Sequence, residues 1–396
     1  MIDGWRVRTL EELAIVGAGN SAPQDEALFA NGTIPFFRTS DVGRIRFGDI
    51  ESSADWLNAQ GARGLRRFPK GTILFPKSGA STFLNHRVMT QADGCVSSHL
   101  ATITAKPEYA DARFLLYFLS TIHAQDLVQD HAYPSLNLPL ITSIRVPTPE
   151  LAEQRRIVAI LDEAFEGIAT AKANANKNLQ NARALFESQL QKVFAERGVG
   201  WLERHLVEVS QKFGRGKSKH RPRNEPKLYG GPYPFIQTGD ISNADHWLTE
   251  YSQTYSELGL SQSLLWPKGT ICIAIVGATV GETAILDFEA CFPDSVIGIV
   301  VNDQLADNEY VEFLLQSTKA LLKEKGKGTA RDNINLGTFE NQTFPFPPLK
   351  KQKEVVAKFN ALATETQRLA SVYKQRLTAL DDLKKSMLHQ AFSGQL

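Results

Sequence analysis

Residues 146–158 read VPTPELAEQRRIV, and residues 344–356 read FPFPPLKKQKEVV. Each stretch leads from prolines into a long segment, 150–194 or 348–392, that contains no proline beyond its first turn. Apolar residues recur along both segments in alternating steps of three and four, which is the period of a coiled-coil helix. Because proline is common in the first turn of a helix, the prolines mark where each helix starts. The sequence therefore predicts two helices of about 44 residues, each about 65 Å long.

The two predicted helices carry matching apolar stripes. A helix with a one-sided stripe is not stable alone in water, and its nearest partner is the other copy in the same chain. About 150 residues separate the two helices, and the ends of a domain often lie close together, so we expect the helices to pair antiparallel. We predict that the seam between them contains Leu151, Val158, Leu161, Phe165, Ile168, Leu179, Phe186, Leu349, Val356, Phe359, Tyr373, Leu377, Leu380 and Met387.

Four polar residues, Gln154, Gln352, Lys172 and Lys384, interrupt this seam. Polar side chains in a coiled-coil seam can fix its register by pairing with one another. They could equally face the polar surface of a partner protein, and the sequence leaves both interpretations open.

The rest of the chain is also written twice, at an offset of 196 to 199 residues. The string IPFFRTSDV (34–42) returns as YPFIQTGDI (233–241), and PKGTI (69–73) returns unchanged at 267–271. One helix is predicted in each copy, at 111–121 and 307–318. Short β-branched or aromatic runs predict strands at 71–75, 100–104, 269–276 and 295–301.

These patterns predict an α+β chain, in which two mixed α/β domains are separated by an intramolecular antiparallel coiled coil with pseudo-twofold symmetry. We expect the first globular domain at 1–147, the first long helix at 148–197, the second domain at 198–345 and the second long helix at 346–396. A pseudo-twofold body suits a ligand that is itself roughly twofold, and double-stranded DNA is the commonest of these.

Composition narrows the class of protein. Of the 396 residues, 42% are hydrophobic and 22% are charged, which is ordinary for a soluble globular protein. The net charge of +1 argues against nonspecific coating of nucleic acid but allows local basic surfaces. The three cysteines lack CxxC spacing, so we expect reduced packing residues rather than a zinc site. The longest apolar run, 271–281, is too short to span a bilayer, and we expect a cytoplasmic protein without membrane contact.

At this point the chain resembles the specificity subunits of type I restriction–modification systems. The resemblance is carried by the globule–helix–globule–helix order, the PxPxLxxQ entry into each helix, and the strings PFIQTGDI (234–241), PKGTI and LKKSMLHQAFSGQL (383–396). It implies that each globule is a target-recognition domain that reads one half of a bipartite, asymmetric DNA target. It also implies that the coiled coil sets the distance between the halves and docks two adenine methyltransferase subunits.

The same resemblance implies that a separate ATP-driven motor subunit cuts DNA. S-adenosylmethionine and ATP would then be bound by partner subunits only, and this chain would hold no cofactor and would not be catalytic.

Two other classes of function compete with this one. A stand-alone DNA methyltransferase or nuclease would act without partner subunits, and a coiled-coil scaffold would make no DNA contact. The sequence has no Asn/Asp-Pro-Pro-aromatic corner of the kind that holds a flipped adenine, and no Asp…Glu-x-Lys nuclease cluster. We therefore expect no catalytic residues and no metal site.

The sharpest basic feature is GRGKSKHRPR (214–223), with Arg215, Lys217, Lys219, Arg221 and Arg223. Its glycines and proline favour a loop, and its cations suit phosphate contact. The alternative is a solvated charged loop, which is the usual fate of such runs. We favour contact with DNA, although the equivalent segment of the first copy, 17–26, is not basic.

RTSD (38–41) and QTGD (237–240) follow apolar runs at equivalent positions. Arg38 could pair with guanine and Gln237 with adenine, because these side chains match the donor and acceptor pattern of those bases in the major groove. Thr39 and Thr238 lie beside them and are further candidates. The alternative is an ordinary turn, and for the aspartates, which are retained in both copies, we expect a capping role.

A second candidate surface is KSGASTFLNHR (77–87) with its counterpart VGATVGET (276–283). Glycine allows the backbone to approach a ligand closely. The side chains proposed to contact DNA there are Lys77, His86, Arg87 and Thr279.

A third candidate surface is HAYPSLN (131–137) with GTARDNIN (328–335), in which Tyr133 and Arg331 occupy matching positions. An ordinary connecting loop is an equal alternative. Asn137 and Asn335, retained in both copies, are expected to tie down a turn.

Overall fold

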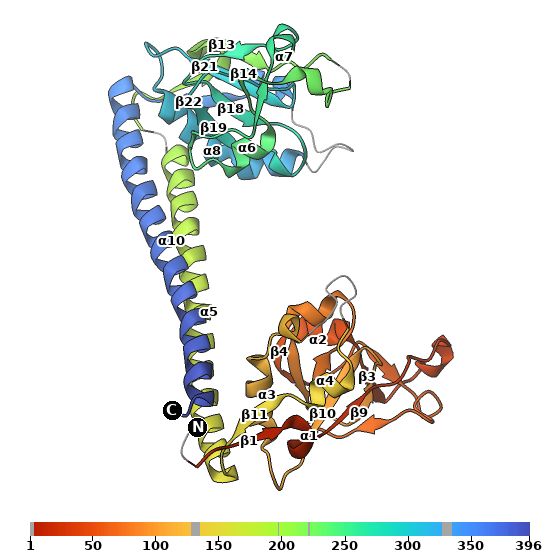
Figure 1. Ribbon diagram of the computed structural model, residues 1–396. Coiled ribbons are helices and arrows are strands. Elements are labelled where there is room, and N and C mark those ends of the chain that lie inside the picture. The colour runs from red at the N-terminus through yellow and green to blue at the C-terminus, as the bar shows by residue number, and fades with distance from the viewer. Residues whose placement is uncertain (1–3, 128–134, 197, 221, 327–334) are drawn as a thin grey trace. The chain divides into compact units, whose positions relative to one another are not determined.

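The computed structural model describes residues 4–127, 135–196, 198–220, 222–326 and 335–396. The chain divides into two compact units, of which unit 1 comprises residues 1–175 and 375–396, and unit 2 comprises residues 176–374. Two long helices, α5 (Leu151–Ala195) and α10 (Leu349–Phe392), contribute to both units (Figure 1). Both helices begin and end within one residue of the segments that the apolar period predicts.

Unit 1 contains β1 (Arg6–Thr9), β2 (Ala14–Ala18), β3 (Ile34–Phe37), β4 (Phe47–Ile50), β5 (Asp55–Leu57), β6 (Arg67–Phe68), β7 (Ile73–Pro76), β8 (Arg87–Thr90), β9 (Gly94–Val96), β10 (Leu100–Ala105) and β11 (Arg145–Thr148). They form a five-stranded sheet of order β2-β10-β7-β8-β4, a four-stranded sheet of order β5-β3-β9-β6, and the pair β1-β11. The strands predicted at 71–75 and 100–104 correspond to β7 and β10, which pair antiparallel inside the larger sheet.

Unit 2 contains β12 (Leu202–His205), β13 (Ser210–Arg215), β14 (Tyr229–Phe235), β15 (Trp247–Leu248), β16 (Gln253–Tyr255), β17 (Leu265–Trp266), β18 (Ile271–Ala274), β19 (Thr283–Leu286), β20 (Ala290–Cys291), β21 (Val296–Val301) and β22 (Thr343–Phe346). Their sheets have the orders β13-β21-β18-β19-β15, β16-β14-β20-β17 and β12-β22. Each order repeats that of unit 1 strand for strand, so the duplication read from the sequence extends to the topology of the sheets.

The remaining helices are α1 (Leu10–Leu13), α2 (Thr39–Ile45), α3 (Ala112–Ser120) and α4 (Leu138–Thr142) in unit 1, and α6 (Thr238–Asn243), α7 (Glu257–Ser261), α8 (Asn308–Gly326) and α9 (Leu336–Glu340) in unit 2. Helix α3 begins where Asp111 accepts hydrogen bonds from two backbone N–H groups of the first turn, a typical N-cap. Helix α8 runs eight residues beyond the predicted segment, because helix-favouring Leu, Lys and Glu residues continue past 318.

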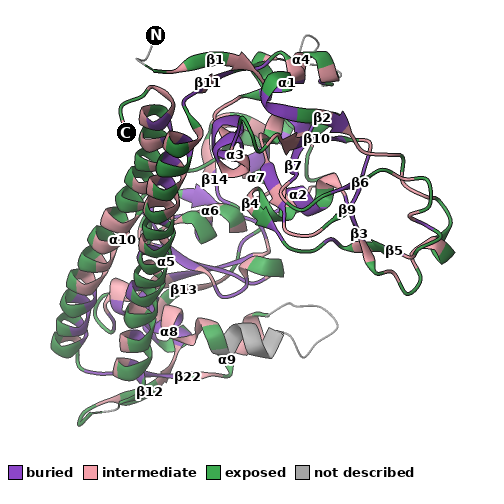
Figure 2. Cartoon of the chain, turned by 90° about the horizontal axis from the view of Figure 1, so that it is seen from below, coloured by how far each residue is buried: buried purple, intermediate pink, exposed green. Residues whose placement is uncertain are grey.

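The long helices pair antiparallel within each unit. In unit 1, Leu161 near the start of α5 shares a core with Leu388 near the end of α10. In unit 2, Phe194 at the end of α5 stacks on Phe359 near the start of α10, with ring centroids 5.9 Å apart. Each of the predicted seam residues is buried or half-buried. Figure 2 shows the rest of both helices as mainly exposed surface.

Gln154 and Gln352 have a role that differs from both roles suggested by the sequence. Gln154 is fully buried, and its amide contacts its own globule rather than a polar partner on the other long helix. Its Oε1 accepts a hydrogen bond from the backbone N–H of Asp111 at 2.9 Å, and its Nε2 donates to the carbonyl oxygen of Tyr109 at 3.1 Å. Gln352 accepts in the same way from the N–H of Asp307 at 2.8 Å. Each glutamine therefore joins a long helix to the segment just before α3 or α8.

The two lysines of the seam lie in unit 1 and are both engaged. Lys172 forms an ion pair with Asp381 across the seam. The ammonium group of Lys384 lies over the rings of Phe47 and Phe165, 4.5 and 4.8 Å from their centroids. Burial, together with the charge of Lys172, lowers the pKa of Lys384 below its ordinary value.

Candidate nucleic-acid interface

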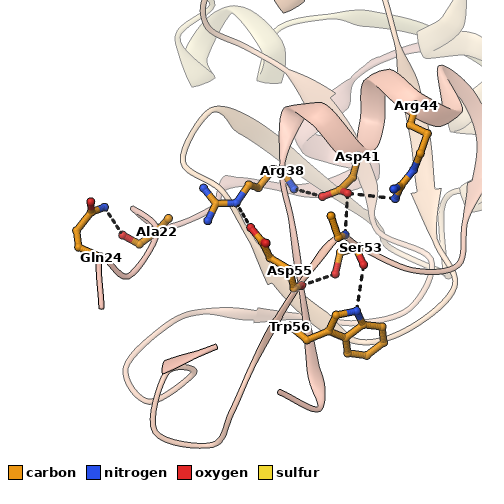
Figure 3. Close-up of polar contacts among 9 residues, drawn as sticks. Ala22, Gln24, Arg38, Asp41, Arg44, Ser53, Asp55 and Trp56 are labelled. Carbon is orange, nitrogen blue, oxygen red and sulfur yellow. Dashed lines mark hydrogen bonds and ion pairs between the residues drawn. The ribbon is translucent and has the colours of Figure 1, made fainter. Parts of the chain in front are cut away.

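The first candidate position in unit 1 is the exit of strand β3, where Arg38 is the N-cap residue of α2. Figure 3 shows that the Arg38 guanidinium forms an ion pair with Asp55 at the start of β5. The guanidinium also lies over the Phe36 ring, 5.2 Å from its centroid. The side chains of Arg38 and Asp55 are each 38% exposed, so the pair is held in place and still open to solvent.

Asp41 organises the turn beneath this pair. Its carboxylate accepts hydrogen bonds from the backbone N–H of Arg38 and of Ala54, each at 2.9 Å (Figure 3). The Arg44 guanidinium lies 3.2 Å from the same carboxylate. The capping role predicted for Asp41 is therefore confirmed, and Asp240 confirms it in unit 2 by accepting from the N–H of Gln237 at 2.7 Å.

The exit of strand β14 in unit 2 has the same geometry with different chemistry. Gln237 is the N-cap residue of α6 and is exposed. Its Nε2 donates to Oε1 of Gln253 at 2.7 Å. Gln253 pairs with Phe235 as Asp55 pairs with Phe36, so Gln253 is the structural counterpart of Asp55. One position of the fold thus carries an Arg–Asp pair in unit 1 and a Gln–Gln pair in unit 2.

Thr39 and Thr238 open helices α2 and α6 and are half-buried beside these pairs. The sequence analysis did not single out Asp55 or Gln253. Both are the first residue of a strand that pairs with the strand before the candidate position, and pairing of this kind is not readable from one sequence.

The basic loop of unit 2 is only partly free. The Nε of Arg215 donates to the carbonyl oxygen of Asp294 at 2.6 Å, and the Arg223 guanidinium lies 2.6 Å from the Asp294 carboxylate. Lys217 and Lys219 are exposed. Arg221 lies outside the described residues. Asp294 therefore anchors the loop at two points, and among the described residues of the loop Lys217 and Lys219 are cations without an ion pair.

Lys212, two residues before this loop segment, is a contact that the sequence analysis missed. Its ammonium group lies 3.9 Å from the centroid of the buried Trp266 ring. Burial and the charge of Lys217 lower its pKa. Lys212 therefore extends the basic strip of the loop onto β13.

The second candidate surface contains one error of prediction. Arg87 is fully buried, and its guanidinium lies 3.3 Å from the centroid of the Phe75 ring. It donates to the carbonyl oxygens of His86 at 2.7 Å and Ile122 at 3.4 Å. The prediction of a surface contact was wrong because β8 is covered on both faces of its sheet, so that Arg87 and its neighbour Val88 are both fully buried. Burial lowers its pKa to about 9.

The other members of this surface remain accessible. Lys77 and His86 are half-buried, and burial together with the charges of Arg46 and Arg87 lowers the pKa of His86. Thr279 is half-buried in unit 2 and donates to the carbonyl oxygen of Val276 at 3.1 Å.

Tyr133 and Arg331, the residues proposed on the third surface, lie outside the described residues. The two asparagines beside them cap short helices. Asn137 accepts from the N–H of Leu140, and Asn335 accepts from the N–H of Thr338, each at 3.0 Å. Their predicted role in tying down a turn is confirmed.

Cys95, Cys272 and Cys291 are free and buried, as the sequence predicts, and burial raises the pKa of each thiol. In the described part of the chain, no group of three His, Cys, Asp or Glu side chains could hold a metal ion. No helix within the described ranges combines the length and the apolar character needed to cross a membrane.

Two sequence comparisons agree with this architecture. One relative is the "Putative type I restriction enzyme MjaX specificity subunit" of Methanocaldococcus jannaschii, 21% identical over 100% of this chain and 94% of the relative. Another is the "Type I restriction enzyme EcoBI specificity subunit" of Escherichia coli, 20% identical over 100% of this chain and 86% of the relative.

Two solved structures share the fold. A chain from the work "Structural basis underlying complex assembly and conformational transition of the type I R-M system" superposes with a TM-score of 0.82, at 20% identity and 100% coverage of both chains. The HsdS subunit of Thermoanaerobacter tengcongensis superposes with a TM-score of 0.62, at 18% identity and coverage of 100% of this chain and 98% of that one.

The model of one protein family, described as "Type I restriction modification DNA specificity domain", matches residues 2–181 and again residues 198–378. The two matches coincide with the two repeats and together cover most of the chain. The chain therefore belongs to the family of type I restriction modification DNA specificity domains.

Proposed function

We propose that this chain is the DNA-recognition subunit of a type I restriction–modification complex, and that each unit reads one half of a bipartite, asymmetric target. One observation carries this proposal. The same exposed strand exit holds Arg38 with Asp55 in unit 1 and Gln237 with Gln253 in unit 2. A shared frame with exchanged polar groups is what two readers of unlike half-sites require.

The chemistry of the two pairs suits base recognition. An arginine can donate two hydrogen bonds to O6 and N7 of guanine, and a glutamine can bond N6 and N7 of adenine. Asp55 and Gln253 hold the reading side chains in one orientation before DNA arrives, which reduces the entropy lost on binding. Lys217, Lys219 and Lys212 would contact phosphates and position unit 2 on the duplex.

The proposed partners are those that the family resemblance implies. We propose that the coiled coil sets the spacing of the half-sites and docks two methyltransferase subunits, and that a motor subunit joins this assembly in the cytoplasm. S-adenosylmethionine and ATP would be bound by those subunits, and this chain would supply sequence recognition without catalysis. The relatives named as specificity subunits support this assignment.

A map of methylated adenines tests the proposal. Genomic DNA from cells with the complete system should show methylation at one bipartite sequence, and deletion of this chain should abolish it. Replacing residues 1–147 with the matching domain of a relative should change one half of the sequence and leave the other half intact. A change in both halves, or methylation that persists without this chain, would contradict the proposal.

A further inference from the structure

The imidazole of His246 is held on three sides in unit 2. It lies between α6 and β15 and stacks on the Phe313 ring of α8, with centroids 4.5 Å apart and planes 13° apart. Its Nε2 lies 3.2 Å from Glu309, and its Nδ1 lies 2.7 Å from Glu312. The His246 side chain is 13% exposed and that of Glu312 is 0% exposed, so this ion pair is shielded from water.

The described groups that contact His246 or its two carboxylate partners are acidic, aromatic or neutral. Glu312 also accepts from Thr283 of β19 and from Gln316 of α8, each at 2.7 Å. The α10 helix supplies neutral amides, because Asn360 donates to Glu309 at 2.8 Å and Gln367 donates to Asp245 at 2.7 Å. Among these described contacts, protonated His246 supplies the positive charge that faces two carboxylates, those of Glu309 and Glu312.

The backbone of His246 is strained. Its φ is +135°, a value that residues with side chains rarely adopt. The matching position of unit 1 is Gly48, with a φ of +105°. The match follows from register, because Leu248 pairs with Leu286 as Ile50 pairs with Thr90. A side chain kept at a glycine position implies that its contacts outweigh the strain.

We call the contacts of His246 with Glu309 and Glu312 the joint of unit 2. The equivalent joint of unit 1 is formed by Arg113, a cation that stays charged, with Asp49 and Asp162. Arg113 follows its cap residue Asp111 by two positions, as Glu309 follows Asp307. The Arg113 guanidinium lies 2.6 Å from Asp49 of β4 and 3.2 Å from Asp162 of α5. Burial lowers the pKa of Arg113, but the hydrogen bond and charge of Asp49 and the charge of Asp162 outweigh it and raise that pKa above its ordinary value, so Arg113 keeps its proton.

We propose that protonated His246 is a positioning residue, which holds the segment before β15 against α8 and α10, and that its deprotonation frees this segment in unit 2 only. The corresponding contacts described in unit 1, those of Arg113 with Asp49 and Asp162, contain no histidine. The two units are then fastened to their long helices by joints of unequal response to pH.

The direction of the effect follows from linkage. Burial lowers the pKa of His246, but the adjacent carboxylates of Glu312 and Glu309 outweigh it and leave the pKa above the ordinary 6.5. A base with a raised pKa gives its full stabilisation below the pKa of the open state, near pH 6.5. That stabilisation is lost as the pH rises through the raised value. Between these limits the open fraction should rise about tenfold per pH unit.

Hydrogen exchange at two matched backbone amides, measured on the full chain without DNA, shows whether each joint is closed or open. The N–H of Asp287 donates to Leu248 at 3.1 Å in unit 2, and the N–H of Gln91 donates to Ile50 at 3.0 Å in unit 1. Hydrogen exchange from pH 6 to 9, corrected for the intrinsic rate, should show protection falling at Asp287 and constant at Gln91. Constant protection at Asp287 would overturn the proposal.

Variants separate the imidazole from general loss of structure. His246→Gly suits the backbone and should make protection at Asp287 lower than wild type at pH 6 and independent of pH. Glu312→Gln keeps the shape and should lower the midpoint of His246 in ¹⁵N-histidine NMR spectra. The exposed His123→Gln in unit 1 is the matched control and should change neither result. A wild-type His246 midpoint at or below 6.5, or an unchanged pH profile in His246→Gly, would refute the assignment. Neither readout depends on whether the chain reads DNA.

Discussion

The side-chain oxygen of Gln154, in the first turn of α5, accepts a hydrogen bond from the backbone N–H of Asp111, 2.9 Å away at the start of α3. The amide nitrogen of Gln154 donates to the carbonyl oxygens of Tyr109 and Pro149, at 3.1 and 3.0 Å. One buried amide thus satisfies three backbone groups at the connection between the globule of unit 1 and helix α5. Gln352 makes the matching contacts in unit 2, so both units have kept this connection between globule and helix.

Replacing Gln154 with leucine should destabilise unit 1. The variant leaves a buried N–H and two carbonyls without partners, and an unsatisfied buried group costs about 1–3 kcal/mol. We expect the free energy of unfolding, measured by urea titration, to fall by at least about 2 kcal/mol. Gln180→Leu, at an exposed position of the same helix, is the control and should change it by less than about 0.5 kcal/mol. Equal stabilities of the two variants would contradict the role of the amide.

Replacing Arg87 with methionine should not destabilise the protein. The Arg87 guanidinium is buried without a carboxylate among its described contacts, and taking an ion out of water is costly. Replacing even a buried ion pair with apolar side chains of similar volume is often neutral or stabilising by about 1–4 kcal/mol, and Arg87 has no such partner to offset the cost of its burial. We therefore expect the urea midpoint to stay the same or rise, and affinity for DNA to remain that of wild type. A large loss of stability would show that the hydrogen bonds to His86 and Ile122 outweigh the cost of burial.

Replacing the polar pair of unit 1 with that of unit 2 should change the base preference of unit 1. Arg38→Gln combined with Asp55→Gln gives unit 1 the pair found in unit 2. We expect one base position in the half-site of unit 1 to change its preference from guanine toward adenine, because a good bidentate contact contributes about 1–3 kcal/mol of discrimination. Methylome sequencing of cells that carry the variant would measure this. The half-site read by unit 2 serves as the internal control, and a change there would contradict independent reading.

The sequence predicted the helices, the duplication and the caps because each depends on neighbours along the chain. The period of α5 and α10, the capping by Asp41 and the turn at Asn137 are local patterns of this kind. The contacts between distant residues were not predictable in this way. Gln154 meets a group 43 residues away, and Arg38 meets Asp55 across 17 residues, through pairings that only the folded sheet creates.

Arg87 is a second residue whose surroundings could not be predicted from the sequence alone. Its cationic side chain suggested a surface position, yet successive residues of a strand face opposite sides of the sheet. Arg87 and Val88 therefore face opposite sides, and both are fully buried because both faces of the sheet are covered at β8. The covering of both faces is a property of the folded domain, and residue type alone does not reveal it.

The salt dependence of DNA binding should reveal which cations of the basic loop contact phosphates. Lys217 and Lys219 are exposed, whereas Arg223 is tied to Asp294 at 2.6 Å. Each phosphate contact releases counterions and steepens the fall of log K with log salt by about 0.9. Lys217→Ala combined with Lys219→Ala should therefore flatten this slope by about 1.8 and weaken binding to all sequences alike. Lys268→Ala, at an exposed lysine in the turn before β18 that pairs with Asp287, is the control and should leave the slope unchanged. An unchanged slope in the double variant would place the phosphate contacts elsewhere, and a change of sequence preference would mean that these lysines read bases.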